Sequence, residues 1–315
     1  MKTCVVIPAF KVEKHILSVI GNIGDCVDRV YVVDDCCPNG SGKLVEDHCD
    51  DKRVVVLYNE ENLGVGGAVK RGYLQGLADD MEVFVKIDGD GQMDPALLPK
   101  FTGPILRGKA DYTKGNRFYM LESLVQMPLL RKFGNAGLSL VNKFTSGYWD
   151  IMDPTNGYTV IHRTALSLLP LNKISDRYFF ESDMLFRLGT LKAVVTDIPM
   201  DAVYGTEESH LKISRAVFQF LPLYFRAFWK RIFYTYFLRD FNVASLEMFV
   251  GAILFLFGLV FGFTSWINSS NLGEFSSSGT VMLAAVPLIM GFQLLLSALH
   301  YDISNIARTP LQSLM

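Results

Sequence analysis

Two long runs without a charged residue lie near the C-terminus of this chain of 315 residues. Met248 to Trp266 is the first run, and Thr280 to Leu299 is the second. At about 1.5 Å per residue, each run would form a helix that spans roughly the 30 Å hydrocarbon core of a bilayer. Buried helices of soluble proteins are seldom this long without a charge. We therefore expect two transmembrane helices, at 244–267 and 280–300.

The charges beside these runs predict an orientation. The connecting loop from Asn268 to Gly279 contains no Lys or Arg, whereas four basic residues shortly precede the first run: Arg226, Lys230, Arg231 and Arg239. Basic residues are enriched on the cytoplasmic side of membrane helices. We therefore expect a multi-pass protein of the inner (plasma) membrane, with a cytoplasmic domain at 1–212, interfacial helices at 213–243 and a cytoplasmic tail at 301–315.

Short apolar runs alternate with segments of helical spacing in the first half of the chain. The expected strands are Cys4 to Ile7, Val30 to Val33, Val54 to Tyr58 and Val83 to Ile87. The expected helices lie near Glu13 to Ile23, Lys43 to Cys49 and Ala68 to Ala78. This βαβ alternation predicts an α/β fold with a mostly parallel sheet covered on both faces. Ligands of such sheets bind at the carboxyl ends of the strands.

The fourth expected strand ends in two carboxylates, Asp88 and Asp90, separated by Gly89. Oxygen ligands at such an edge suit a hard divalent cation that holds a diphosphate, and Gln92 could add a neutral oxygen. Asp94 has the position of a cap for the next helix. The alternative is a turn in which these residues satisfy only backbone geometry.

Two further strand ends carry polar or glycine-rich segments. Asp34 and Asp35 could accept hydrogen bonds from a ribose or a base, or could cap a helix or turn instead. Gly64 to Ala68 resembles a phosphate-cradling turn at the start of a helix that carries Lys70. The turn matches neither the dinucleotide fingerprint nor the P-loop, so it does not by itself indicate NAD or ATP.

Two more carboxylates, Glu181 and Asp183, stand among aromatic residues. One reading is a catalytic base with a raised pKa, and the other is a pair of acids at a helix start. The cysteines all lie in the first 49 residues and should be reduced in a cytoplasmic domain. A zinc site built from Cys36, Cys37, His48 and Cys49 is the alternative to ordinary thiols.

These motifs together resemble the family-2 glycosyltransferases, which have the GT-A Rossmann-like fold. The segments that carry the resemblance are Val6 to Phe10, Val32 to Asp35, Asn62-x-Gly64 with Ala68 and Gly72, and Asp88 to Pro95. A narrower set is similar to the polyprenyl-phosphate glycosyltransferases, the group of dolichyl-phosphate mannose synthase and bacterial undecaprenyl-phosphate glucosyltransferases. That set comprises Gly115-Asn116-Arg117, Arg131-Lys132, Asp150-x-x-Asp153-Pro154, Glu208-Ser209 and the two terminal runs.

The resemblance implies roles for individual residues. Mg²⁺ or Mn²⁺ would be held by Asp88, Asp90 and Gln92. The acceptor phosphate would be bound by Arg117, Arg131, Lys132 and Asn135. The nucleotide sugar would be bound by Pro8, Ala9, Phe10, Glu13, Asp35, Lys70, Asp88, Gly89, Tyr204 and His210. The catalytic candidates are Asp90, Arg117, Arg131, Glu181 and Asp183.

Some positions depart from the pattern of the mannose synthases. Val12 stands where they have an acidic residue, with Glu13 one place late, and Tyr204 and His210 stand where they have basic residues. These departures fall at expected nucleotide contacts. The resemblance therefore does not choose the nucleotide or the sugar.

The implied reaction is inverting transfer of a single hexose from a nucleotide sugar to a polyprenyl phosphate at the cytoplasmic membrane face. A UDP-sugar such as UDP-glucose is favoured, and GDP-mannose is possible. A phosphomonoester has a second pKa of about 6, so this acceptor is anionic at neutral pH and scarcely needs a base. Glu181 and Asp183 are therefore weaker catalytic candidates than the other three.

Two other functions are alternatives. A processive polysaccharide synthase is disfavoured because no Gln-x-x-Arg-Trp sequence follows residue 183. A non-catalytic membrane scaffold that retains the fold is disfavoured by the intact acidic and basic motifs. A homo-oligomer, up to a tetramer, is expected because Gly251, Gly258 and Gly262 would allow close helix approach. We expect no nucleic-acid partner.

Overall fold

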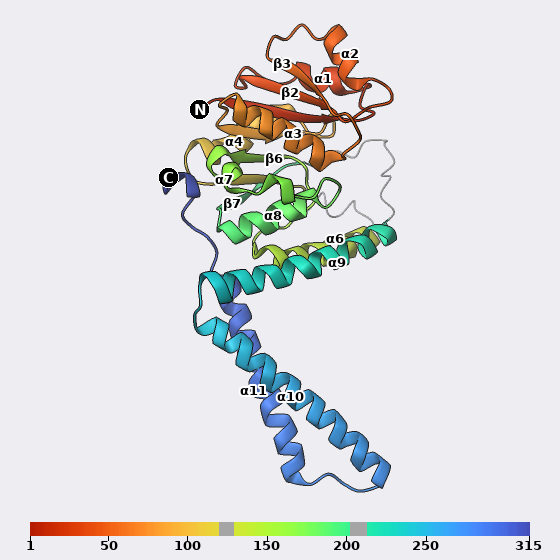
Figure 1. Cartoon of the computed structure of the whole chain (residues 1–315), viewed down its shortest axis with the longest axis vertical. Helices are drawn as coiled ribbons and strands as arrows, with labels where there is room; N and C mark the ends of the chain where they lie inside the picture. The colour runs from red at the N-terminus through yellow and green to blue at the C-terminus, as the bar shows by residue number, and fades with distance from the viewer. Residues whose placement is uncertain (120–128, 202–212) are drawn as a thin grey trace. The chain divides into compact units, whose positions relative to one another are not determined.

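The structure is a computed structural model that describes residues 1–119, 129–201 and 213–315 (Figure 1). The chain forms two compact units. The first consists of residues 1–228 together with 307–315, and the second consists of residues 229–306. The first unit is an α/β domain, and the second contains two long apolar helices.

A seven-stranded sheet with the order β3-β2-β1-β4-β6-β5-β7 forms the centre of the first unit. Neighbouring strands are parallel except where β6 pairs with β4 and β5. The carboxyl ends of the other six strands therefore meet at one edge, as the βαβ pattern predicted. The strands are β1 (Thr3–Ala9), β2 (Arg29–Asp34), β3 (Val54–Tyr58), β4 (Val83–Lys86), β5 (Tyr112–Asn116), β6 (Thr159–His162) and β7 (Val195–Pro199).

Helices cover both faces of this sheet. Side chains alternate along β1, so Val5 and Ile7 pack into one core and Cys4 and Val6 into the other. The first core includes residues of α1 and α4, and the second includes residues of α3 and α8. The helical segments of this unit are α1 (Ile16–Gly21), α2 (Ser41–His48), α3 (Val65–Ala78), η1 (Pro95–Leu97), α4 (Leu98–Leu106), α6 (Leu129–Ser146), α7 (Arg163–Leu168), η2 (Leu171–Lys173), α8 (Phe180–Leu191), most of α9 (Ile213–Ile232) and η4 (Leu311–Ser313).

The last residues of the chain belong to the α/β domain. The backbone N–H groups of Leu311 and Gln312 donate to the carboxylate of Asp111 at 2.9 and 3.1 Å. The side-chain amide of Gln312 donates to the backbone oxygen of Ala110 at 2.7 Å. Leu311 is buried in the same core as α3 and α8. Of the segment expected as a cytoplasmic tail, residues 307–315 are thus a docked part of the domain, whereas its first residues continue α11 to Ser304.

Replacing Asp111 with Ala should lower the free energy of unfolding by about 3 kcal/mol, because a fully buried carboxylate would lose three backbone donors. The third donor is the N–H of Val194 at 2.8 Å. Chemical unfolding of the full chain in detergent measures the change. Asp28→Ala is the control, since that carboxylate accepts from Thr3 in a partly exposed position and should cost about 1 kcal/mol or less. Equal losses in the two variants would contradict the prediction.

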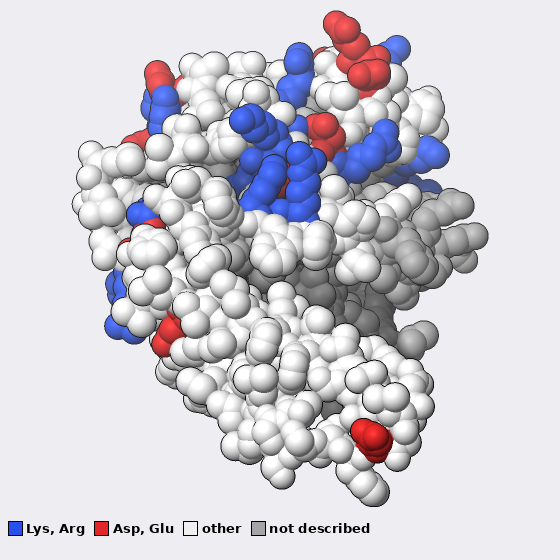
Figure 2. All heavy atoms as spheres, turned by 60° about the horizontal axis from the view of Figure 1, so that its bottom comes forward, with Lys and Arg blue, Asp and Glu red and all other residues white. Residues whose placement is uncertain are grey.

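The second unit contains a π-helical segment, η3 (Phe233–Arg239), and the helices α10 (Val243–Leu272) and α11 (Ser278–Ser304). Both α10 and α11 are long and apolar enough to cross a membrane. Large apolar side chains are exposed along both helices, and their surface is almost entirely white in Figure 2. An apolar surface of this extent needs a covering such as lipid.

The small residues of α10 pack against α11 of the same chain. A Cβ atom at Gly258 would lie 2.8 Å from the backbone oxygen of Ala284, and one at Gly251 would lie 3.1 Å from that of Gly291. A Cβ atom at Gly262 would lie 3.3 Å from the Cβ of Ala284. These glycines do allow close helix approach, as predicted, but the approach occurs within one hairpin. They therefore no longer support an oligomer.

One basic residue before the first apolar run has a buried acidic partner. The guanidinium of Arg231 forms two hydrogen bonds with the carboxylate of Asp302, at 2.8 and 3.0 Å, and both side chains are buried. The hydroxyl of Tyr236 donates to the same carboxylate. Arg231 is therefore neutralised within the second unit, and the orientation argument depends on the other three basic residues.

Candidate active site

The carboxylates that end β2 have backbone partners. Asp34 accepts hydrogen bonds from the N–H groups of Cys37 at 2.7 Å and Gly42 at 2.6 Å, and so holds the start of α2. Asp35 accepts from Gly64 N–H at 2.7 Å and from the Asn59 side chain at 2.8 Å. Both are buried. The capping and turn alternative thus describes what these carboxylates do in this structure.

The end of β1 presents the other expected nucleoside contacts at the same edge of the sheet. Ala9 is buried in the core, whereas the ring of Phe10 is exposed. The carboxylate of Glu13 accepts hydrogen bonds from the side chains of Asn39 and Ser41. Hydrogen bonds from its own backbone N–H and from Asn39 lower the pKa of Glu13, so this group is an anion at neutral pH.

The glycine-rich turn before α3 is in close contact with the segment that precedes α8. The N–H of Gly67 donates to the backbone oxygen of Asp176 at 3.0 Å, and a Cβ atom at Gly66 would lie 2.4 Å from the backbone oxygen of Ser175. The amine of Lys70 pairs with Asp176 and donates to the backbone oxygen of Ile174 at 2.9 Å. The glycines therefore have a packing role, and the N–H groups of Gly64 and Gly67 already have protein acceptors.

The acidic pair occupies the loop that follows β4. Gly91 has a φ of +77°, which allows the chain to turn back after Asp90. A Cβ atom at Gly89 would lie 3.0 Å from the side chain of Ile16, so the loop is close to α1. The carboxylate of Asp90 accepts from the N–H of Gln92 at 3.0 Å. Asp88, Asp90 and Gln92 are thus held in one tight turn at the carboxyl edge of the sheet.

A buried lysine connects this turn to α8. Lys86 lies on β4, and its amine is 2.8 Å from Asp88 and 3.2 Å from Glu181. Burial by itself lowers the pKa of Lys86, but the charges of Asp88 and Glu181 outweigh it and raise the pKa above its ordinary value. Lys86 was not recognised in the sequence. The sequence feature that could have indicated it is a charged residue within an otherwise apolar strand.

Both acidic residues of the first turn of α8 have cationic partners. Glu181 pairs with Lys86, and Asp183 lies 3.0 Å from the Nε atom of Arg187. Asp183 also accepts from the N–H of Ser175 at 2.8 Å. Ion pairs and hydrogen bonds of this kind occupy the carboxylate oxygens. The arrangement favours the helix-start alternative over a catalytic base.

The end of β5 positions the expected acceptor-binding arginine. Arg117 directly follows this strand, and its Nε and Nη2 atoms lie 2.7 and 3.0 Å from the two carboxylate oxygens of Asp153. Asp153 is fully buried, whereas 35% of the Arg117 side chain is exposed. A bidentate pair fixes the plane of a guanidinium. The sequence indicated Asp153 only as part of the Asp150-x-x-Asp153-Pro154 motif, and its contact with Arg117 was not predicted.

A second buried lysine lies on the same strand. The amine of Lys114 donates to the backbone oxygen of Asn156, and burial lowers the pKa of Lys114 to about 8. The Asn156 side chain in turn donates to Asp153 at 3.4 Å. Burial also raises the pKa of Asp197, on β7, to about 6. Asn156, in the loop before β6, thus links the buried amine of Lys114 to Asp153, the partner of Arg117.

The remaining expected site residues lie on α6 or outside the described chain. Lys132 and Asn135 are partly exposed on the first turns of α6. Arg131 lies on the same turn, but its side chain is outside the described part of the structure. Tyr204 and His210 fall between residues 201 and 213, outside the described residues.

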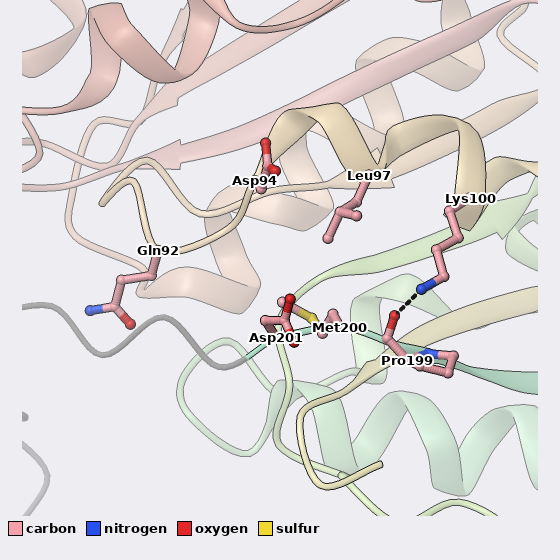
Figure 3. Close-up of a pocket in the computed structure, with 7 residues that line it drawn as sticks. All are labelled: Gln92, Asp94, Leu97, Lys100, Pro199, Met200 and Asp201. Carbon is pink, nitrogen blue, oxygen red and sulfur yellow. Dashed lines mark hydrogen bonds between the residues drawn. The ribbon is translucent and has the colours of Figure 1, made fainter. Parts of the chain in front are cut away.

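A hollow of about 210 Å³ lies beside Gln92 at this edge (Figure 3). The start of α4 and the end of β7 bound it, and Lys100 donates to the backbone oxygen of Pro199 at its rim. Its lining residues are Gln92, Asp94, Leu97, Lys100, Pro199, Met200 and Asp201. The carboxylate of Asp94 accepts from Ala96 N–H, which confirms its expected capping role.

The donor set after β4 fits a divalent cation that also binds a substrate phosphate. Among the described residues, no group of three His, Cys, Asp or Glu side chains is placed to hold a metal alone, so the zinc alternative finds no support. Mg²⁺ is commonly bound by one or two carboxylates together with substrate phosphates. Two carboxylates and one amide oxygen in a single turn meet that requirement.

Comparison with known proteins is consistent with this arrangement. Residues 4–169 match the family described as Glycosyl transferase family 2. The chain is 27% identical over 233 residues to the UDP-N-acetylglucosamine--dolichyl-phosphate N-acetylglucosaminyltransferase of Methanococcus voltae, covering 70% of this chain and 92% of that protein. It is 29% identical over 207 residues to the undecaprenyl-phosphate mannosyltransferase of Micrococcus luteus, covering 64% and 84%.

Solved structures show the same fold. Glucosyl-3-phosphoglycerate synthase from Mycobacterium tuberculosis, in complex with uridine diphosphate, superimposes with a TM-score of 0.53. The two proteins are 20% identical, and the match covers 73% of this chain and 79% of the other. At this identity the likeness concerns the fold alone. It confirms the predicted GT-A-like architecture of the α/β domain.

Proposed function

The chain belongs to glycosyl transferase family 2, and on that basis we propose that it transfers a single hexose from a nucleotide sugar to a polyprenyl phosphate, with inversion at the anomeric carbon. The relatives from Methanococcus voltae and Micrococcus luteus are named for transfer to dolichyl or undecaprenyl phosphate. Their matches cover most of their own length. Two helices that could cross a membrane suit a lipid acceptor.

The observation that carries the proposal is the shared edge of β4 and β5. The acidic turn follows β4, and the Arg117–Asp153 pair follows β5. The strand β6 lies between them, so their ends are about 10 Å apart at the usual spacing of strands. That separation leaves room for a diphosphate-linked sugar between a group that binds the donor and a group that binds the acceptor.

On the donor side, Asp88, Asp90 and Gln92 would hold Mg²⁺ or Mn²⁺, which when bound would stabilise the negative charge of the departing diphosphate. The exposed ring of Phe10 gives the nucleoside a face to pack against. The other proposed nucleotide-sugar contacts are Pro8, Ala9, Glu13, Asp35, Lys70, Gly89, Tyr204 and His210. We favour a UDP-sugar such as UDP-glucose, with GDP-mannose as the second choice.

On the acceptor side, Arg117 would bind the phosphate through its exposed part while Asp153 fixes its direction. Arg131, Lys132 and Asn135 are proposed to complete the phosphate site from α6. A dianionic phosphate needs no deprotonation, so the protein has only to orient it towards the anomeric carbon. The ion pairs of Glu181 and Asp183 are consistent with a reaction that uses no general base.

In the membrane, we propose that α10 and α11 cross the bilayer with the α/β domain on the cytoplasmic side. The exposed apolar surface of the two helices supports this placement. A homo-oligomer, up to a tetramer, stays a prediction. The inner (plasma) membrane is the expected location.

The proposal is tested with detergent-solubilised protein, Mn²⁺, a short polyprenyl phosphate and a panel of radiolabelled nucleotide sugars. We expect organic-phase label from one donor, with one sugar per lipid, and its loss when EDTA removes the metal. Products with many sugars per lipid would instead indicate a processive synthase. Absence of label from every donor, in folded protein, would favour a non-catalytic scaffold.

A further inference from the structure

A buried cation lies directly behind the acidic turn. Lys86 is the last residue of β4, and the side chain of Asp88, from the loop that follows, reaches the face of the sheet on which the Lys86 amine lies. On that face the Lys86 amine lies between Asp88, at 2.8 Å, and Glu181, at 3.2 Å. Only 1% of the Lys86 side chain is exposed, so its charge depends on these partners.

The loop before β6 leaves room for this cluster. A Cβ atom at Gly157 would lie 2.5 Å from the Lys86 amine and 2.6 Å from an oxygen of Asp88. Any side chain there would have to displace one of the two groups. The glycine at this position therefore leaves space for the ion pair between Lys86 and Asp88.

The two carboxylates differ in access to the site. Asp88 is 29% exposed, whereas Glu181 is only 12% exposed and points back to Lys86 from α8. One cation is thus shared between a carboxylate that can reach a ligand and another that is nearly enclosed. If Glu181 were absent, the whole charge of Lys86 would be paired with Asp88.

We propose that Glu181 is a positioning residue for the metal site: it pairs with the Lys86 ammonium, so that Asp88 can turn from Lys86 to a divalent cation. This inference rests on the proposed metal-dependent function. Partners behind a metal ligand typically change metal affinity about 10-fold to 100-fold when they are removed. Glu181 then acts through Lys86 and Asp88 and need not touch the substrate.

The test measures Mn²⁺ binding to the full chain in detergent, with UDP present, by electron paramagnetic resonance. Glu181→Gln should raise the Kd for Mn²⁺ about tenfold, because the metal must then compete with an undivided Lys86–Asp88 pair. Adding Lys86→Met to that variant removes the competitor and should return the Kd to within about threefold of the wild-type value. Glu82→Gln removes an equal charge at the exposed start of the same strand and should leave the Kd unchanged.

Glu181→Asp tests whether metal binding depends on the contact between Glu181 and Lys86 or only on a negative charge at position 181. It keeps the charge but shortens the reach to Lys86, so we expect a higher Kd here too. An unchanged Kd in Glu181→Asp, or no rescue in the double variant, would overturn the inference alone. Failure of the wild-type chain to bind Mn²⁺ would overturn the metal-dependent function and this inference with it.

Discussion

Replacing Asp90 with Asn should lower kcat/KM for sugar transfer by about 1,000-fold while the domain stays folded. Asp90 follows Gly89 in the turn after β4, and its carboxylate accepts a hydrogen bond from the N–H of Gln92 at 3.0 Å. The substitution preserves shape and removes one negative charge. The expected loss therefore reports a missing metal ligand. Initial rates with saturating lipid acceptor measure it, with circular dichroism as the check of folding.

Two other aspartates make this result specific. Asp80→Asn changes an exposed carboxylate that pairs with Arg163, and activity should stay at the wild-type level. Asp183→Ala should only weaken transfer, because Asp183 holds Arg187 and the Ser175 backbone. If Asp183→Ala abolished transfer as fully as Asp90→Asn, a general base would be required after all.

Replacing Arg117 with Ala should reduce kcat/KM for the lipid acceptor about 100-fold and also destabilise the domain by about 3 kcal/mol. The first effect comes from the lost phosphate contact. The second arises because Asp153 is fully buried and would lose its bidentate partner. Acceptor kinetics measure the first effect, and chemical unfolding in detergent measures the second.

A second substitution separates these two effects. Arg117→Ala with Asp153→Ala should recover much of the stability, since no buried charge is left unpaired, but should recover no activity. Arg163→Ala is the matched control, because its pair with Asp80 is exposed and should be worth less than about 1 kcal/mol. Recovery of activity in the double variant would show that Arg117 does not bind the acceptor.

The strands β1 to β4 and the helices between them could be predicted from sequence because each of these strands is a short apolar run between turn residues. The strands β5 and β7 lack that pattern, since they include polar residues such as Lys114 and Asp197. The capping role of Asp94 was also readable, since Asp before Pro is a common start of a helix. Lys86 and Lys114 were missed because their charges lie inside strands, where only the folded sheet supplies Glu181 and Asn156 as partners. Contacts between residues far apart in sequence leave no local pattern.

The glycine turn before α3 shows a different limit. Its composition is typical of a phosphate-binding loop, and sequence alone could not distinguish that use from tight packing. The structure places Ser175 and Phe180 against Gly66, so the absence of a side chain is already explained by contact within the domain. Similarly, the small residues of α10 indicated close helix approach but not which helix would approach.

The docked C-terminal segment restricts how many times the chain can cross a membrane. Residues 228 and 307 belong to the same folded unit, and a folded unit lies on one side of a bilayer. If α10 and α11 cross the bilayer as proposed, the chain between these residues has to cross it an even number of times, whatever the charges of its loops. With two helices the count is satisfied, and losing either crossing would pull Leu311 out of the core. If α10 and α11 cross the bilayer as proposed, folding of the α/β domain would therefore favour chains in which both helices have been inserted.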